Sequence, residues 1–188
     1  MRLGSKAELK EGRTEMTMKR VETSVEPSAM PVVDDASLPT DLTPLLKYGP
    51  LGDDELPNVG MLRAGYRGET LEQSLEALTP LRPFVQVVRL RGQIVGYVTV
   101  ERDGPVPGAA YLRNIAVKLE LRKLGIGTSL LKHAIQVSKD MYRKTLALRV
   151  DPANATAVNF YRSMGFTTVA TVVSKKSGKL RLLMSREL

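Results

Sequence analysis

Two glycines separated by one residue, in the stretch RKLGIGTSLLKHAI (residues 122–135), constrain the fold of this chain more than any other feature. They follow the apolar run AAYLRNIAV (109–117) and open residues 125–141, in which apolar side chains recur at helical spacing. These apolar residues are Ile126, Leu130, Leu131, Ala134, Ile135, Val137 and Met141. The pattern predicts a strand, a glycine-containing turn and an amphipathic helix over 125–141.

The positions of Gly125 and Gly127 permit two interpretations. The first N–H groups of a helix have no partner within the helix, so glycines at its start let a phosphate approach them. Arg122 and Lys123 would add positive charge there. Alternatively, the glycines only allow the strand to turn into the helix. The residues alone leave both interpretations open, but two known loops are excluded. A Walker loop requires a lysine after Gly127, and a dinucleotide fingerprint requires glycine in place of Leu130.

The rest of the chain consists of short periodic segments separated by Gly, Pro and Ser. Leu71, Leu75 and Leu78 repeat at helical spacing, and Arg91-Gly92 joins two β-branched runs as a hairpin. The expected strands are 30–35, 83–90, 93–102, 109–117, 145–150, 166–174 and 179–188, the expected helices are 37–49, 68–80, 125–141 and 154–164, and 50–60 is expected to be a loop.

This order of elements predicts an α/β (α+β) protein. Its core would be a single mixed, mostly antiparallel central sheet of about seven strands with helices on both faces. The 188 residues suffice for one such domain. We assign the domain to residues 30–188. Residues 1–29 are polar and contain no aromatic residue, so we interpret them as a flexible N-terminal extension.

The composition excludes several classes of chemistry. The chain has no cysteine, which rules out disulfides, thiolate metal ligands and a cysteine nucleophile. A single histidine, His133, argues against a histidine-rich metal centre, so we expect no metal. Since Lys132, Gln136 and Lys139 surround it opposite the apolar stripe, we expect His133 on the surface.

No apolar run has the length of a membrane span, and the N-terminal residues lack the apolar segment of a secretory signal. We therefore expect a cytoplasmic protein that is a monomer or a homodimer and has no membrane partner. The net charge of +8 suits nucleic acid, a small polyanionic ligand or an acidic partner. Three phenylalanines, six tyrosines and no tryptophan offer few platforms for stacking bases, which weakens the nucleic-acid interpretation.

Two motifs resemble the GNAT superfamily of acyl-CoA-dependent N-acetyltransferases. The first is Arg-x-x-Gly-x-Gly after an apolar strand, within NIAVKLELRKLGIGTSLL (114–131), and the second is LRVDPANATAVNFYRSMGF (148–166). The order of elements from about residue 30 to 188 is also similar. Leu119 and Lys123 stand where the family often has Pro and Gly. The residues of the second motif that have the family's spacing are Asn154, Ala157, Tyr161, Gly165 and Phe166.

The resemblance implies that acetyl-CoA is the cosubstrate and lies where the strand before the loop separates from its neighbour. It implies that the backbone of Ile115, Ala116 and Val117 contacts the pantetheine arm and the acetyl carbonyl, and that Asn154 contacts the pantetheine region. The pyrophosphate would lie against Arg122, Lys123, Leu124, Gly125, Ile126, Gly127 and Thr128.

The implied reaction is direct attack of an amine on the thioester, which agrees with the lack of a cysteine for an acyl-enzyme. A backbone N–H near Ala116 or Val117 would hold the developing oxyanion. Tyr161 would act as the general acid that protonates the departing thiolate. Taken in isolation, Tyr161 is also the kind of residue that packs a short helix onto a sheet.

The general base is where the chain departs from the family. Its N-terminal acetyltransferases, including the ribosomal-protein alanine acetyltransferase, usually have Glu in the middle of a Leu-Glu-Val strand. Here the triplet is Leu148-Arg149-Val150, and arginine cannot accept a proton near neutral pH. Another carboxylate, either Glu101 at the end of a strand or Glu120 before the loop, or else water, would have to accept the proton.

The sequence does not decide the chemistry of the acceptor. Asp53, Asp54 and Glu55 would suit a cationic amine, whereas Arg149 and the segment SKKSGK (174–179) would suit an acidic acceptor. The leading hypothesis is an acetyl-CoA-dependent N-acetyltransferase that acts on a protein or peptide amine. The alternatives are an acetyltransferase for a small-molecule amine and a non-catalytic acyl-CoA-binding module.

Overall fold

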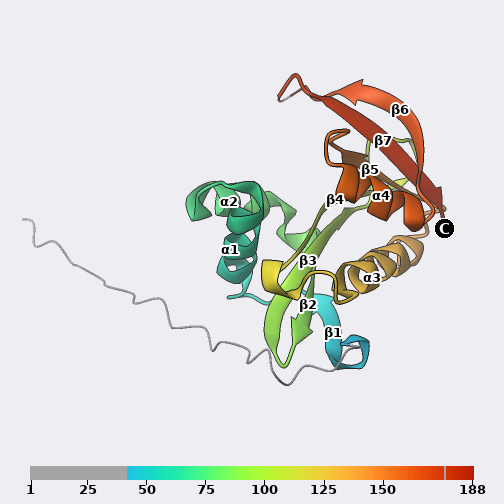
Figure 1. The fold of residues 1–188 in the computed structure, drawn as a ribbon. Coiled ribbons are helices and arrows are strands. Elements are labelled where there is room, and N and C mark those ends of the chain that lie inside the picture. The colour runs from blue at the N-terminus through green and yellow to red at the C-terminus, as the bar shows by residue number, and fades with distance from the viewer. Residues whose placement is uncertain (1–41, 176) are drawn as a thin grey trace, which may run out of the picture. The chain divides into compact units, whose positions relative to one another are not determined.

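The computed structural model describes residues 42–175 and 177–188 (Figure 1). The chain divides into two units, residues 1–36 and 37–188, and the described residues belong to the second. The expected extension at 1–29 and the expected strand at 30–35 lie outside the described residues, so both remain predictions.

Seven strands form one sheet in the order β1-β2-β3-β4-β5-β7-β6. Neighbouring strands are antiparallel except β4 and β5, which are parallel, so the expected mixed, mostly antiparallel sheet is confirmed. The strands are β1 (Leu46–Pro50), β2 (Val85–Leu90), β3 (Gln93–Glu101), β4 (Ala110–Val117), β5 (Thr145–Val150), β6 (Thr167–Val173) and β7 (Leu180–Glu187), and the α-helices are α1 (Leu56–Arg67), α2 (Leu71–Leu78), α3 (Ile126–Asp140) and α4 (Ala155–Ser163).

Helices cover both faces of this sheet, and each face has its own hydrophobic core (Figure 1). Successive residues of a strand point to opposite faces, so the neighbours Tyr97 and Val98 of β3 lie in different cores. Tyr97 packs with Val59 of α1 and Leu78 of α2. Val98 lies in the larger core with residues of α3 and α4, among them Leu130. The helices α1 and α2 therefore cover one face, and α3 and α4 cover the other.

The parallel strands β4 and β5 are paired only near their beginnings. Beyond these pairs β4 continues to Val117 along β3, and β5 continues along β7. The edge of β4 that faces β5 is therefore open after Leu112. The paired residues are Ala110 with Leu146, Tyr111 with Ala147, and Leu112 with Leu148.

The predicted helix over 37–49 is wrong in its described part. A single 3-10 turn, η2 (Thr43–Leu45), leads into β1, which pairs with β2 from Leu46 opposite Leu90 to Pro50 opposite Gln86. Pairing with the apolar strand β2 outweighs the local capping signals. Proline is tolerated at the end of β1 because this strand lies at the edge of the sheet.

The predicted loop over 50–60 is wrong in its second half, because α1 begins within it. Pro57 lies in the first turn of α1. Backbone N–H groups in this turn have no partner within the helix, so proline, which lacks an N–H, costs no hydrogen bond there. Gly68 ends the helix with φ 66°. Gly60 obscured the helical pattern, and a Cβ on this residue would lie 2.8 Å from Leu75 Cδ2. Glycine there lets α1 approach α2 closely.

The elements from residue 68 onward follow the predicted order. Thr70 and Gln73 form a capping box at the start of α2, with Thr70 Oγ1 accepting from the Gln73 N–H (3.2 Å) and Gln73 Oε1 accepting from the Thr70 N–H (3.0 Å). Arg91 and Gly92 turn the β2–β3 hairpin with φ of 50° and 83°. None of the described helices is both long and apolar enough to cross a bilayer.

Candidate active site

The glycine turn joins β4 to α3 through a 3-10 turn, η4 (Leu119–Leu121). Lys123 and Gly125 both have left-handed backbone conformations, with φ of 67° and 77°. The Ser129 N–H makes the first bond of the helix, to the Gly125 carbonyl (3.0 Å). The N–H groups of residues 126–128 precede that bond, so they face out of the helix N-terminus, where an anion can accept from them.

The two glycines differ in what the fold requires of them. Gly125 has a φ that only glycine adopts without strain, so the turn itself requires glycine. Gly127 lies inside α3, and a Cβ there would meet Val117 Cγ2 at 4.0 Å, which is an ordinary contact. The fold therefore does not require glycine at position 127. The open space at this position supports the interpretation that a ligand approaches the backbone there.

Positive charge surrounds the turn. Arg122 and Lys123 are exposed, and Leu124 packs against the core under α3. Arg122 Nε donates to the Val117 carbonyl (3.3 Å), and its guanidinium carbon lies 6.0 Å from the centroid of the Tyr66 ring. A cationic rim beside a helix N-terminus provides the electrostatics that a phosphate site needs.

The open edge of β4 presents the backbone of Ile115 and Val117. The Lys118 N–H donates to the Val95 carbonyl (2.8 Å), so the backbone groups of residue 118 face β3. These groups alternate in direction along an antiparallel strand, so those of Ala116 face β3 as well. Of the three residues expected to contact the acyl chain through their backbone, Ile115 directs both backbone groups to the open edge and Val117 directs its N–H there, while the Val117 carbonyl accepts from Arg122. The backbone of Ala116 faces β3.

Two further expected site residues lie on α4. Asn154 caps the helix, because its Oδ1 accepts from the Ala157 N–H (3.0 Å), and this cap does not use its Nδ2 group. Tyr161 is 8% exposed, and its ring packs edge-on against Phe166 with centroids 5.8 Å apart. Burial raises the pKa of the Tyr161 hydroxyl far above its ordinary value, so the hydroxyl is protonated at neutral pH.

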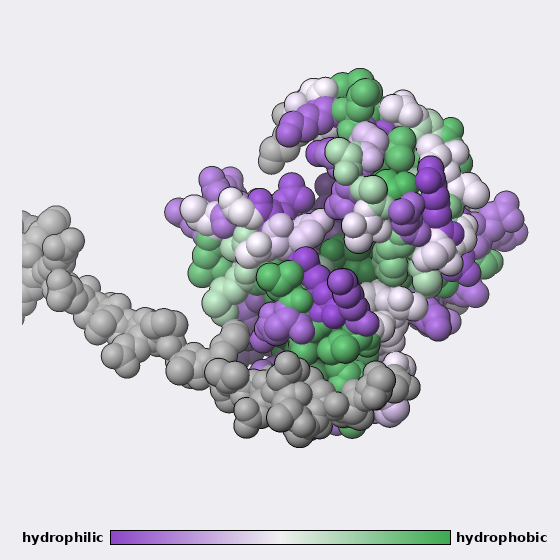
Figure 2. Space-filling view, viewed as in Figure 1, coloured by the Kyte–Doolittle hydropathy of each residue, from purple (hydrophilic) through white to green (hydrophobic). Residues whose placement is uncertain are grey.

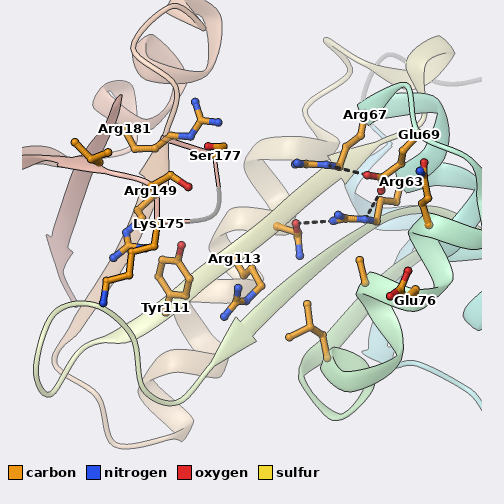
Figure 3. A pocket seen from close by; sticks show the side chains of 16 residues that line it. Arg63, Arg67, Glu69, Glu76, Tyr111, Arg113, Arg149, Lys175, Ser177 and Arg181 are labelled. Atoms are coloured by element: carbon orange, nitrogen blue, oxygen red, sulfur yellow. Dashed lines mark hydrogen bonds and ion pairs between the residues drawn. The ribbon is translucent and has the colours of Figure 1, made fainter. Parts of the chain in front are cut away.

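A cavity of about 1160 Å³ lies on the other face of the sheet. Figure 2 shows a hollow between α2 and the β6–β7 hairpin with hydrophilic residues on both sides. Figure 3 shows its walls, with Arg63 and Arg67 on one side and Arg149 and Arg181 on the other. Its lining includes Arg63, Arg67, Glu69, Glu76, Tyr111, Arg113, Asn114, Arg149, Lys175 and Arg181.

The cavity adjoins the open edge of β4. Arg113 and Asn114, the first two residues of β4 beyond its pairing with β5, both line it. Arg149, the first residue of β5 beyond that pairing, lines it as well. The region where β4 and β5 separate is therefore a wall of the cavity on one face, while Leu112 and Leu148 belong to the core of the other face.

In this wall a hydrogen bond joins α1 to β4, and an ion pair joins α1 to the segment between α1 and α2. Arg63 Nη1 donates to Asn114 Oδ1 (3.1 Å), and Asn114 Nδ2 donates to Thr99 Oγ1 (3.4 Å). Arg63 Nε lies 2.6 Å from Glu69 Oε1 in an ion pair that lacks hydrogen-bond geometry. Glu69 also accepts from Ser74 Oγ (2.9 Å). These contacts hold Arg63, whose side chain is only 10% exposed, in one position.

The two carboxylates expected as candidate bases are placed differently. Both oxygens of Glu101 accept from Arg113, one of them from Nη2 at 2.8 Å. Hydrogen bonding to Glu101 raises the pKa of the Arg113 guanidinium. Glu120 is exposed on η4 and does not line the cavity. Arg149, at the position of the family's Glu, is exposed and has no carboxylate partner within residues 42–175 and 177–188.

The acidic loop before α1 is bound to arginines of the same chain. Asp53 Oδ1 accepts from Arg82 Nη2 (2.8 Å). Glu55 accepts from Arg89 Nε (2.9 Å) and from the Gly52 N–H (2.7 Å). Neither acidic residue lines the cavity. The expectation that the acidic loop binds a cationic acceptor amine is therefore not supported by its position.

His133, which was expected on the surface, is half-buried. Its ring stacks on Tyr48 with centroids 4.8 Å apart, and its buried Nε2 has no hydrogen-bond partner among the described residues. Tyr48 Oη also donates to Ser129 Oγ, which ties β1 to α3. The sequence pattern missed this contact because it predicted a helix over 37–49, where the structure has a strand that covers this side of α3.

Several cavity residues were not expected from the sequence. Arg113 and Asn114 did carry a signal, because two successive polar residues interrupt the apolar run of β4. The β3–β4 register shifts between Thr99 and Val100, opposite these residues, which marks a β-bulge. Arg63 carried no signal, because the sequence predicts no element over residues 61–67.

The fold and the site define a class of protein. An open parallel strand pair, with an N–H-rich glycine turn on one face and a cavity on the other, is the acyl-CoA N-acyltransferase fold. The chain belongs to the acetyltransferase (GNAT) family, whose profile matches residues 57–166. The relationship expected from the two sequence motifs is thereby confirmed.

The chain is similar to N-terminal acetyltransferases. The N-alpha-acetyltransferase of Sulfurisphaera tokodaii is 29% identical to this chain in an alignment of 93 residues. The match covers 44% of this chain and 56% of that relative. The chain thus spans little more than half the length of this curated relative. Ard1 from Thermoplasma volcanium has a TM-score of 0.65 at 18% identity, covering 77% of this chain and 98% of that one. Arabidopsis thaliana Naa50, solved with the bisubstrate analogue CoA-Ac-MVNAL, has a TM-score of 0.60 at 18% identity, covering 77% and 99%. The two solved structures show the shared fold alone.

Proposed function

We propose that the protein is an acetyl-CoA-dependent N-acetyltransferase that moves an acetyl group directly to the α-amine of a protein or peptide. The observation that carries the proposal is the open edge of β4 beyond Leu112 and Leu148, which leads from the glycine turn to the cavity on the other face. Similarity to an N-alpha-acetyltransferase supports the α-amine as the acceptor. In this proposal residues 30–188 are the catalytic domain and residues 1–29 are an extension.

The residues of the turn and the open edge fit acetyl-CoA. The N–H groups of residues 126–128, together with Arg122 and Lys123, would hold the pyrophosphate. The backbone groups of Ile115, which face the open edge, would pair with the pantetheine arm, as would Nδ2 of Asn154. When bound, acetyl-CoA supplies the thioester from which the acetyl group is transferred.

Two groups of the chain would stabilise the transition state. The Val117 N–H, which points to the open edge, would hold the negative charge that develops on the thioester oxygen. Tyr161 keeps a proton on Oη at neutral pH because burial raises its pKa, and it gives that proton to the departing sulfur. The same low-polarity surroundings would raise the pKa of a thiolate formed beside it, which offsets the effect of burial on the acidity of Tyr161.

The proton of the attacking amine has no carboxylate acceptor at the position where the family has Glu. Both oxygens of Glu101 are bound to Arg113, so we assign Glu101 the role of positioning that arginine. Glu69 is likewise paired with Arg63 and Arg67. We propose that water in the open cavity accepts the proton from an amine that binds in its neutral form.

The test measures CoA release from acetyl-CoA with a panel of peptides and a panel of small amines, with mass spectrometry of the products. We expect acetylation of free peptide α-amines and none of the same peptides with a blocked N-terminus. Turnover of the small amines alone would overturn the peptide assignment. If calorimetry shows acetyl-CoA binding but no amine is acetylated, the chain is a binding module and the proposed activity is wrong.

A further inference from the structure

The cavity carries an excess of positive charge. Figure 3 shows arginines on both of its walls and Arg113 between them. Its only acidic lining residues are Glu69 and Glu76, so the described lining has six basic side chains against two acidic ones. The basic residues are Arg63, Arg67, Arg113, Arg149, Lys175 and Arg181.

Four of these six basic residues are paired with three carboxylates of the chain. Arg63 and Arg67 pair with Glu69. Arg113 pairs with Glu101, and Arg181 pairs with Asp151. In the part of the chain that the structure describes, Arg149 and Lys175 have no carboxylate within ion-pair distance. Arg149 and Lys175 are therefore the basic lining residues that are available to bind an acidic group without first breaking an ion pair of the described chain.

The position of Arg149 relates this charge to the reaction. Leu148 is the last residue of β5 that pairs with β4, and Arg149 follows it at the point where the strands separate. An acceptor amine must reach the open edge of β4 at that same point. An extended residue spans about 3.3–3.6 Å, so an acceptor group that contacts Arg149 lies only one or two residues from the amine.

We propose that the cavity selects acceptors with a carboxylate close to the amine, namely peptides with Asp or Glu as the second or third residue. This inference rests on the proposed function. Arg149 and Lys175 would bind the acceptor carboxylate, and the same two charges would repel basic acceptors. The charge that selects the acceptor also assists the reaction, because a nearby guanidinium disfavours the ammonium form of the bound amine. Arg149 thereby offsets the absence of a basic carboxylate at its own position.

The experiment compares kcat/KM for matched peptides that differ only at residues two and three, with Asp-Glu, Ser-Gln or Lys-Arg at these positions. We expect the acidic peptide to exceed the neutral one by roughly fivefold to tenfold, and the basic peptide to be poorest. The preference should shrink at higher salt, since the cavity is open to solvent.

Variants assign the preference to particular residues. Arg149→Gln and Lys175→Gln each remove one unpaired charge, and Arg149→Glu reverses it. We expect Arg149→Gln to abolish most of the preference for the acidic peptide and Arg149→Glu to favour the basic peptide. Both side chains are exposed, so loss of folding is not expected, and thermal melting checks it. Lys132→Gln on the exposed side of α3 removes the same charge away from the cavity and should leave the preference unchanged.

The outcomes separate the two proposals. Acetylation of all three peptides at equal rates would overturn the acidic preference and leave the acetyltransferase activity intact. A preference that Arg149→Glu does not alter would overturn the assignment to this cavity. If none of the peptides is acetylated although acetyl-CoA binds, the proposed acetyltransferase activity on peptides is wrong, and the acidic preference that rests on it is wrong as well. An RNA oligonucleotide that competes with the acidic peptide would identify a different polyanion as the ligand and also contradict the proposal.

Discussion

Leu112 of β4 and Leu148 of β5 are the last paired residues of the two parallel strands, and the residues that follow them, Arg113 and Arg149, both line the cavity. The point where the sheet opens is therefore also part of the wall of the cavity. From this point the open edge of β4 runs to Val117, shortly before the glycine turn.

The hydroxyl of Tyr161 is expected to act in the chemical step. Tyr161→Phe keeps the ring packed on Phe166 and removes the proton donor, so kcat should fall about a hundredfold while the Kd for CoA stays nearly constant. Steady-state kinetics and calorimetry measure the two quantities. Unchanged kcat would show that Tyr161 serves only to pack α4.

Replacing the two glycines of the turn by alanine should affect different properties: stability at position 125 and CoA affinity at position 127. Gly125→Ala places a side chain at φ 77° and should lower the free energy of unfolding by about 1 kcal/mol. Gly127→Ala meets only Val117 at 4.0 Å and should fold as well as the wild type. Its Cβ would stand where the pyrophosphate approaches, so the Kd for CoA should rise about tenfold. Tight CoA binding by Gly127→Ala would place the phosphates elsewhere.

The cap and the ligand contact of Asn154 can be separated. Asn154→Ala loses the bond to the Ala157 N–H and should cost about 1 kcal/mol of stability. Asn154→Asp keeps an oxygen for that bond but removes the Nδ2 donor, so it should fold normally and raise the KM for acetyl-CoA. Chemical denaturation and kinetics of both variants provide the test. A normal KM for the Asp variant would limit Asn154 to capping.

His133 should make stability depend on pH. Burial lowers the pKa of its imidazole below 6.5, although Asp140 partly opposes this, so the unfolded chain binds the proton more readily than the folded one. Stability is therefore fully present above about pH 6.5 and falls as the pH drops toward the folded pKa. Urea midpoints across this range measure the effect.

His133→Phe provides the matched control for that measurement. Phenylalanine keeps a ring against Tyr48 and removes the titrating group, so the loss of stability over this pH window should disappear. His133 is the only histidine of the chain, so no other imidazole contributes there. The same acid-induced loss in His133→Phe would assign it to a different group.

Much of the fold could be predicted from local patterns. The helix α2, the hairpin turn at Arg91-Gly92 and the amphipathic stripe of α3 arise from residues close together in the chain, and each was predicted at the place where the structure has it. β1 and α1 were misplaced. β1 is a strand because β2 pairs with it, and the glycines of α1 weaken its helical pattern.

The sequence alone determined the family, the order of most elements and the residues of the glycine turn, because these depend on spacing within short segments. Only the tertiary structure decided which charges are free. Asp53 and Glu55 are bound by Arg82 and Arg89, which lie about thirty residues away. Arg149, beside the opening between the strands, has no carboxylate partner among the described residues. Ion pairs between distant segments leave no periodic signal in a sequence, so the charge of the cavity becomes evident only when the strands are assembled.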